Sequence, residues 1–345
     1  MIDMKGWYSR RETIKKMGAA GLAAAMPRSA SAQAAADFYT GKTVSIICGY
    51  NPGGGVDVGT RLIAKHMARF LPNGASVVVK NMQGASGIVA ANYLYVKAAP
   101  DGLTLAVPGR DWVPKPILGQ GNAVYDSLRF AYIGSTGGTN NVGWVRGDLG
   151  VRTPAELRNS PKKLIFGGLP QNTVLSSLPK LLQDIGLPVN VIMGYENTAR
   201  IVLAIEQKEL DAIYTAITSL ARRRDLIDSK ILVPVFQSEP EHPGVPLVQE
   251  LVPEPQRPLL KLVHASATFG MPLIAPPGTP PDRVEFLRKA FIDMGRDATF
   301  QAEARVIGEP AGAPIEGREL AGKVADVLRS LTPSTIASFK SLTGE

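Results

Sequence analysis

The sequence predicts an α/β protein made of two doubly wound domains, and three observations support this fold class. Strand-like and helix-like segments alternate along most of the 345 residues. The part expected to fold is about 300 residues long, which exceeds the usual size of a single hydrophobic core. Two glycine-rich junctions, well separated along the chain, each join an expected strand to an expected helix.

The expected strands are short apolar runs bounded by Gly, Pro, Asn or Asp. They are Val44–Cys48, Ser76–Val79, Leu103–Val107, Phe130–Gly134, Val142–Arg146, Lys163–Phe166, Asn190–Met193, Ala212–Tyr214 and Ile231–Phe236. Helical periodicity occurs in segments between and after them. These are Asp57–Phe70, Ser86–Lys97, Thr153–Arg158, Leu178–Ile185, Ala199–Lys208 and Ser219–Asp228, followed beyond a proline-rich turn by Asp282–Arg296 and Ile315–Leu331. The alternation predicts parallel sheets with helices on both faces.

Residues 1–32 have the features of an export signal. A twin-arginine stretch around Arg10 and Arg11 is followed by the mildly apolar run Met17–Met26 and by two overlapping A-x-A cleavage patterns within 30–34. The apolar run is too short to span a bilayer. A flexible basic N-terminus is the less supported alternative. Thr13 stands where twin-arginine signals favour an aromatic residue, so the twin-arginine and general secretory routes both stay open.

Composition argues against several classes of function. Six basic and two acidic residues lie in residues 1–32, so removing them lowers the net charge from +8 to +4, and we expect no nucleic-acid partner. His66, His242 and His264 lack the spacing of metal ligands, and we expect neither a metal nor a cofactor. Cys48 lies inside an apolar strand, which predicts a buried, unreactive thiol. The sequence contains no motif typical of a catalytic nucleophile, so we expect no catalytic residues.

The first glycine-rich junction is a candidate anion-binding loop. It contains Pro52, Gly53, Gly54, Gly55 and Asp57, and we expect Asp57 to be the N-cap of the following helix. The first amides of a helix lack intrahelical acceptors and lie at the positive end of its dipole, so they attract anions. The spacing matches neither a P-loop nor a dinucleotide-binding fingerprint. A tight turn without a ligand is the structural alternative.

The second junction follows the expected strand Lys163–Phe166 and contains Gly168, Gln171, Asn172 and Thr173. Because proline is tolerated in the first turn of a helix, Pro179 predicts that the next regular helix begins near Ser177. Two such loops, one in each domain, are able to hold one ligand between them.

With these loops and the motifs given below, the chain resembles the extracytoplasmic substrate-binding receptors of tripartite tricarboxylate transporters, often called Bug-type receptors. The resemblance extends over nearly all of the chain after the export signal and depends on several motifs occurring in one order. They are Pro52–Asp57, Asn81–Gly87, Ala98–Leu105, Gly194-Tyr195, Leu203–Glu206 with Glu209–Asp211, and Ala275–Pro280. At the second loop, Leu169–Asn172 replaces the Gly- and Ser-rich run of many relatives.

The resemblance implies a periplasmic-binding-protein-like (type II) fold with a ligand cleft between two lobes. It implies that residues 37–138 and 247–345 form the first lobe and residues 139–246 the second. The two glycine-rich loops would hold a ligand carboxylate, and the Asn81–Gly87 turn with Ser86 would border the cleft. Four aromatic residues are candidates for a wall of the ligand pocket, although each is equally well explained as a core or surface residue: Tyr195, Trp112, Trp144 and Tyr214. Tyr195 is the best placed of them, because it follows the expected strand Asn190–Met193.

The function implied by the resemblance is capture of a small organic carboxylate, such as a dicarboxylate, a tricarboxylate or an aromatic acid. The protein would act in the periplasm as a monomer and deliver its ligand to integral membrane transporter subunits. We therefore expect a binding protein and not an enzyme. Two alternatives remain: an exported enzyme that acts on a carboxylate with Asp57 as base, and a periplasmic sensor subunit.

Overall fold

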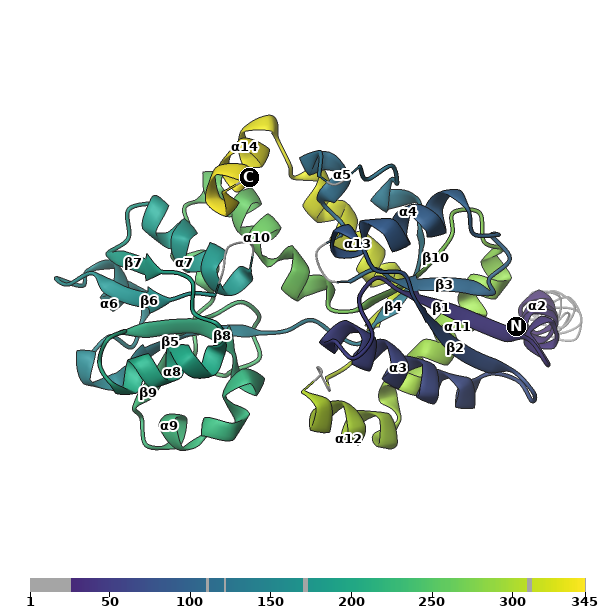
Figure 1. Ribbon diagram of the computed structural model, residues 1–345, viewed down its shortest axis with the longest axis horizontal. Coiled ribbons are helices and arrows are strands. Elements are labelled where there is room, and N and C mark those ends of the chain that lie inside the picture. Colours follow the sequence, from purple (N-terminus) through teal and green to yellow (C-terminus); the bar gives the residue numbers. More distant parts are fainter. Residues whose placement is uncertain (1–25, 110–111, 121, 170–172, 309–311, 345) are drawn as a thin grey trace, which may run out of the picture.

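The computed structural model describes residues 26–109, 112–120, 122–169, 173–308 and 312–344. Figure 1 shows two α/β lobes side by side, each built around one sheet. The chain passes from the first lobe to the second after β4 and returns after β9. The expected fold class, an α/β protein with two lobes, is therefore confirmed.

The first lobe contains a six-stranded sheet in the order β11-β4-β10-β3-β1-β2. Its strands are β1 (Thr43–Cys48), β2 (Ser76–Asn81), β3 (Thr104–Val107), β4 (Ala131–Ser135), β10 (Pro272–Ala275) and β11 (Ile315–Glu316). Its helices are α2 (Met26–Tyr39), α3 (Gly55–Met67), α4 (Ile88–Val96), α5 (Lys115–Leu118), α11 (Pro281–Arg296), α12 (Ala298–Ile307) and α13 (Gly317–Arg329).

The second lobe contains a five-stranded sheet in the order β7-β6-β8-β5-β9. Its strands are β5 (Asn141–Arg146), β6 (Leu164–Gly167), β7 (Val189–Ile192), β8 (Ala212–Ala216) and β9 (Leu232–Gln237). Its helices are α6 (Pro154–Arg158), α7 (Val174–Asp184), α8 (Thr198–Glu206) and α9 (Asp225–Asp228). The expected helix Ser219–Asp228 is instead a 3₁₀ segment, Ile217–Arg223, followed by the short helix α9.

Both sheets are mixed, although the alternating pattern predicted parallel sheets. Strand β5 runs antiparallel to β8 and β9, and β10 runs antiparallel to β3 and β4. The first residue of β5, Asn141, pairs with Ala216 at the end of β8, and Pro272 at the start of β10 pairs with Ser135 at the end of β4. These two strands begin at the edge where their neighbours end, because the chain enters each sheet from the other lobe.

Two helices that the sequence did not predict pack against the cores of both lobes: α10 (Arg257–Phe269) and α14 (Pro333–Thr343). Adjacent residues of α10 belong to different cores, since Leu262 packs in a first-lobe cluster with Trp112 and Val263 packs in a second-lobe cluster with Phe166. Sheet strands come from residues 43–135 and 272–316 in one lobe and from 141–237 in the other. The exact division of the chain into lobes stays a prediction, because α10 belongs to both cores.

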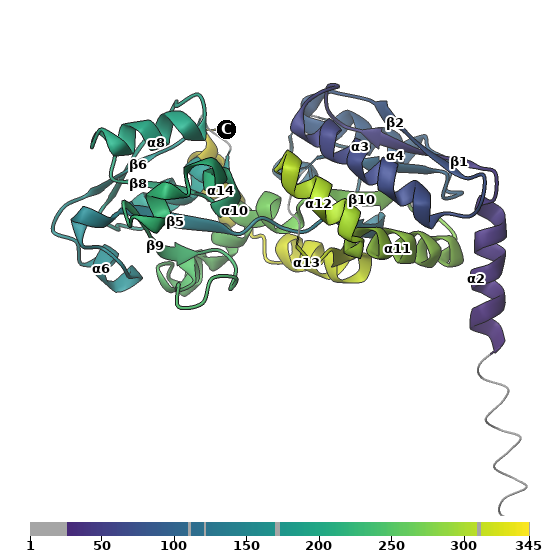
Figure 2. The same ribbon diagram turned by 90° about the horizontal axis from the view of Figure 1, so that it is seen from below.

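Helix α2 projects from the first lobe, as Figure 2 shows. Both expected cleavage patterns fall in this helix, and most of the predicted export signal, residues 1–25, lies outside the described residues. The end of α2 is packed against the lobe, because Ala35 and Tyr39 are fully buried and the Tyr39 ring stacks on Phe286 at 5.1 Å. Cleavage at either pattern would leave these packed residues in place.

Candidate functional site

The first glycine-rich loop joins β1 to α3, as the sequence predicts, but its helix begins earlier than expected. Gly54 is the N-cap and α3 starts at Gly55, so Asp57 lies in the first helical turn and is not the N-cap. Gly53 has a φ of +82°, a conformation that favours glycine. Pro52, Gly53, Gly54 and Gly55 are all exposed.

A compact polar network fixes this loop around the buried carboxylate of Asp57. One oxygen accepts hydrogen bonds from the Gly53 amide at 2.9 Å and from Arg61 Nε at 2.8 Å, and the other accepts from Asn81 Nδ2 at 2.7 Å. Arg61 also donates to Asn81 Oδ1 at 3.0 Å, and Asn81 donates to the Tyr50 carbonyl at 2.9 Å. The end of β1, the start of α3 and the end of β2 are thus joined by side chains.

The same contacts determine the protonation state of Asp57. Burial raises the pKa of this carboxyl, but the hydrogen bonds from Arg61, Asn81 and the Gly53 amide outweigh burial and lower its pKa to about 2. Asp57 is therefore ionised at neutral pH, with both oxygens engaged. A carboxylate in this state is a weak general base, since catalysis favours a base whose pKa lies near the working pH.

The turn that precedes α4 is held in an unusual backbone conformation next to this loop. Ala85 and Ser86 have φ values of 45° and 49°, in the left-handed region that residues with a side chain rarely occupy. A Cβ atom at Gly87 would collide with the Pro108 carbonyl, so glycine is required where the turn meets the end of β3. The turn places the exposed residue Ser86 at the cleft.

The second loop is organised by hydroxyl groups. Ser176 Oγ donates to the Leu169 carbonyl at 2.7 Å and accepts from Thr173 Oγ1 at 3.2 Å. Thr173 is the N-cap of α7, which begins at Val174, so Pro179 lies inside the helix and not in its first turn. The buried residues on both sides of Pro179 show that packing outweighs the backbone hydrogen bond that proline cannot make. Gln171 and Asn172 lie outside the described residues.

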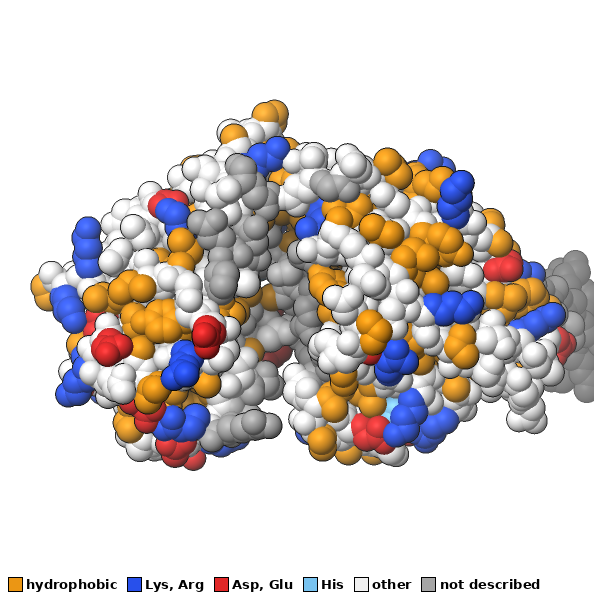
Figure 3. Space-filling view, viewed as in Figure 1, with side chains coloured by type: hydrophobic (Ala, Val, Ile, Leu, Met, Phe, Trp, Pro, Cys, Tyr) orange, Lys and Arg blue, Asp and Glu red, His pale blue; other side chains and the backbone are white. Residues whose placement is uncertain are grey.

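A cavity of about 140 Å³ lies between the lobes and brings Ser86 of the first lobe together with Thr173 of the second. Its wall includes residues from α5, from the start of α7, from α10 and from α14. They are Ser86, Pro114, Lys115, Leu118, Gln120, Thr173, Val174, Ser177, Leu262, Val263, Ala265, Ser266, Phe339 and Thr343. Figure 3 shows the molecule hollowed between the two lobes. The first-loop residues Pro52–Gly55 do not line this cavity.

Tyr195 does not line the interlobe cavity. It lines a separate groove of about 360 Å³ on the second lobe together with Arg200, Leu203 and Glu209. Its backbone amide donates to the Gly168 carbonyl at 3.2 Å, so it is next to the second loop without lining the interlobe cavity. The other three aromatic candidates, Trp112, Trp144 and Tyr214, are buried in the cores.

Sequence reasoning missed several residues of the cavity wall, among them Lys115, Ser266, Phe339 and Thr343. None of them lies in a recognisable motif. The only relevant signal was the Pro-flanked segment around Lys115, which follows β3 and carries a basic residue near the cleft.

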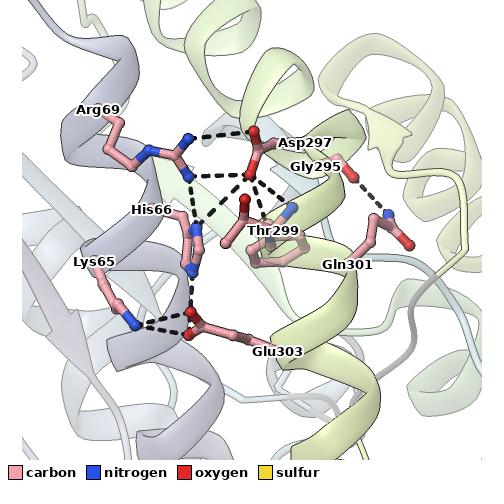
Figure 4. A network of polar contacts seen from close by, with 9 residues as sticks. Lys65, His66, Arg69, Gly295, Asp297, Thr299, Gln301 and Glu303 are labelled. Atoms are coloured by element: carbon pink, nitrogen blue, oxygen red, sulfur yellow. Dashed lines mark hydrogen bonds and ion pairs between the residues drawn. The ribbon is translucent and has the colours of Figure 1, made fainter.

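A second polar network lies outside the cleft and holds α3 against α12 (Figure 4). Lys65 pairs with Glu303 at 2.8 Å and Arg69 pairs with Asp297 at 3.0 Å. Between these pairs lies the buried ring of His66, with Nδ1 at 3.1 Å from Arg69 and Nε2 at 3.2 Å from Glu303. These contacts position the helix whose N-terminus carries the first loop.

Other features of the site concern metals, membranes and thiols. In the part of the chain that the structure describes, no group of three His, Cys, Asp or Glu residues is arranged to hold a metal ion. Among the same residues, no helix has the length and apolar character needed to cross a bilayer. Cys48 is fully buried, and burial raises the pKa of its thiol, which confirms the expected buried position and keeps the thiol protonated.

Two α/β lobes with a cavity between them are a common architecture of solute-binding proteins. The model of the family described as tripartite tricarboxylate transporter family receptor matches residues 60–303. The chain belongs to this family, which confirms the resemblance. The matched region contains the Ser86 turn and the second loop, and it begins just after the first loop.

Two curated relatives match in sequence. A UPF0065 protein in the tcbD-tcbE intergenic region of Pseudomonas sp. (strain P51) is 25% identical over 273 residues, which cover 78% of each chain. A UPF0065 protein in the gbd 5' region of Cupriavidus necator is 37% identical over 98 residues, which cover 28% of this chain and 29% of the relative. The chain therefore spans less than a third of the second relative.

Solved structures agree on the fold. A TctC solute binding protein from Polaromonas, solved without ligand, superimposes with a TM-score of 0.69 at 20% identity, covering 88% of this chain and 98% of that one. A structure described as a periplasmic transporter superimposes with a TM-score of 0.52 at 21% identity, covering 84% and 94%. The family and the first of these structures are receptors or binding proteins and not enzymes.

Proposed function

We propose that this protein captures a small organic carboxylate between its lobes and delivers it to the membrane subunits of a tripartite tricarboxylate-type transporter. The observation that carries the proposal is the cavity to which both lobes contribute hydroxyl groups, Ser86 from one and Thr173 and Ser177 from the other. Lys115 adds a positive charge to the wall, and no acidic side chain lines it among the described residues. Hydroxyl groups and a cation suit a carboxylate.

Ligand contacts to both lobes would favour the closed form. A ligand shifts an opening and closing equilibrium only through its differential affinity for the two forms, so it must bind groups on both sides of the cleft. Several charge-assisted hydrogen bonds are sufficient for micromolar affinity, a free energy of about −8 kcal/mol, after the cost of ordering. We propose that the protein acts as an exported monomer in the periplasm and that the closed form is recognised by the transporter.

The state of Asp57 disfavours the enzymatic alternative. That alternative requires Asp57 as a base, yet its carboxylate accepts three hydrogen bonds and its pKa is lowered to about 2. We assign Asp57 the role of holding the first loop in the shape in which the first amides of α3 face the cleft. This role requires ionisation and not proton transfer.

A thermal-shift screen of mono-, di- and tricarboxylates at constant ionic strength tests the proposal. We expect at least one acid to raise the melting temperature in a concentration-dependent manner. Stabilisation by none of them would refute carboxylate capture.

A substitution tests the part played by the first loop. We propose that closure of the lobes brings the first loop, which does not line the cavity in this form, to the ligand, so Gly54→Val should abolish binding. The variant should stay folded, because a Cβ atom at Gly54 meets only the Asn51 carbonyl, at 3.5 Å. The matched control is Gly322→Val, at an exposed glycine of α13 whose Cβ would meet no atom within 4 Å. Normal affinity in Gly54→Val would remove the first loop from the site.

A further inference from the structure

We propose that the C-terminal helix α14 forms an apolar wall of the interlobe cavity, and that its residue Phe339 selects carboxylates that have one charged end and a compact apolar body. This inference rests on the proposed carboxylate-binding function. It assigns specificity to a helix that contains none of the motifs by which the sequence resembles its family.

Helix α14 connects the lobes near the cavity. The chain leaves α13, whose buried residues Leu320 and Val324 belong to a first-lobe core, and enters α14 at the N-cap Thr332. At the other end of α14, Leu342 is buried in the core of the second lobe. In Figure 1 the helix lies at the top of the second lobe beside α10. The C-terminal helix is therefore attached to both lobes.

Phe339 is the point at which both cores and the cavity meet. Its partly buried side chain packs against the first-lobe cluster that contains Trp112 and against the second-lobe cluster that contains Phe166. It also lines the cavity, together with Leu262 and Val263 of α10. A ring held from two sides presents a fixed surface to whatever occupies the cavity.

The chemistry of the wall favours a ligand with few charges. Half of the lining residues are apolar: Pro114, Leu118, Val174, Leu262, Val263, Ala265 and Phe339. Within the described part of the chain, Lys115 is the only charged residue of the lining. A tricarboxylate would bring additional negative charges against apolar surface, and burial of a charge without a partner is costly.

The size of the cavity restricts the apolar body. A cavity of about 150 Å³ is known to hold a benzene-sized molecule. The interlobe cavity is close to this size, at about 140 Å³. Its ligand would thus carry an apolar part no larger than about six carbons next to Phe339, with the carboxylate towards Ser86, Thr173 and Lys115.

Isothermal titration of the full chain with benzoate, hexanoate, succinate and citrate tests this inference. We expect the dissociation constant for benzoate or hexanoate to be at least about tenfold lower than that for citrate. We expect Phe339→Ala to weaken binding of the preferred acid about tenfold while leaving citrate unchanged. The control is Ser338→Ala, an exposed neighbour on the same helix, which should bind like the wild type.

Because Phe339 packs against two cores, Phe339→Ala could fail to fold. Circular dichroism monitors this, and Phe339→Leu supplies a milder variant that keeps an apolar side chain but changes its shape. We expect Phe339→Leu to prefer hexanoate over benzoate relative to the wild type.

The outcomes separate the two proposals. Tighter binding of succinate or citrate than of either monocarboxylate, or an unchanged preference in both folded Phe339 variants, would overturn the role of α14 and leave carboxylate capture intact. Binding of none of the acids would overturn the proposed function itself.

Discussion

The two strand-to-helix loops at the cleft differ in the chemistry that holds them. The first loop is organised by an ionised carboxylate, a guanidinium and an amide, through Asp57, Arg61 and Asn81. The second is organised by neutral hydroxyl groups of Thr173 and Ser176. Hydrogen bonds to a charged group are roughly twice as strong as neutral ones. We therefore expect the first loop to be the more firmly preformed of the two and the second to be the more adaptable.

Removing the Asp57 carboxylate should have the largest effect. Asp57→Ala leaves three donors without their common acceptor, and we expect the free energy of unfolding to fall by about 3 kcal/mol, with loss of ligand binding. Urea denaturation measures the first effect and calorimetry the second. A fall of less than about 1 kcal/mol would show that the ionic network does not hold the loop.

Acid should weaken the first loop and spare the second. The folded-state pKa of Asp57 is lowered from 3.8 to about 2, so its stabilising contribution is present above about pH 4 and is lost as the pH falls towards 2. We expect the stability difference between wild type and Asp57→Asn to be constant above pH 4 and to shrink below it. In Ser176→Ala, the same comparison should show no such change over this range. A difference that persisted at pH 2 would contradict the lowered pKa.

The same small substitution should affect the two loops unequally. A Cβ atom at Gly168 would lie 2.8 Å from Ser176 Oγ, whereas at Gly54 the nearest atom is 3.5 Å away. We expect Gly168→Ala to destabilise the protein by about 1–2 kcal/mol and Gly54→Ala to change its stability by less than about 0.5 kcal/mol. Thermal denaturation measures the loss of stability in both variants. Equal losses would show that the second loop accommodates the added Cβ atom without a free-energy cost.

Removing one hydroxyl from the second loop should have a smaller effect than removing the Asp57 carboxylate from the first. Ser176→Ala deletes the hydrogen bond to the Leu169 carbonyl, and we expect a loss of about 1 kcal/mol. Ligand affinity should fall only a few-fold, because Thr173 and Ser177 still contribute hydroxyl groups to the cavity wall. Thr173→Ser, which keeps its hydroxyl, serves as the matched control. A loss as large as that of Asp57→Ala would erase the difference between the loops.

The sequence predicted the elements that have one buried face and a clear boundary. Strand β1 and helix α3 follow from apolar spacing and the glycine run between them. Helix α10 was not predicted from the sequence, because Pro253, Pro255 and Pro258 at and before its first turn are typical of a loop. Its polar stripe, which includes Arg257, Lys261 and Thr268, is the signal that could have indicated an amphipathic helix.

The residues of the candidate site likewise fall into those that the sequence predicts and those that it does not. Ser86 and Thr173 could be predicted because each follows a strand in its own lobe, and local sequence determines such loops. Phe339 and Ser266 could not, because their place in the wall depends on how two lobes and a returning C-terminal helix pack together. The N-cap position of Asp57 was wrong because glycine at 54 ended the loop three residues earlier than a polar cap would have.

The helix α10, in which neighbouring residues contribute to different cores, has a consequence for exchanging parts between relatives. A fragment limited to residues 139–246 would lack the side chains of Leu259, Leu260 and Val263 that complete its core. Neither lobe is thus an independent folding unit. A chimaera that is to keep the binding properties of one parent must take α10 and α14 from the parent that supplies the second lobe. The positions of these two helices against the first lobe must also be preserved.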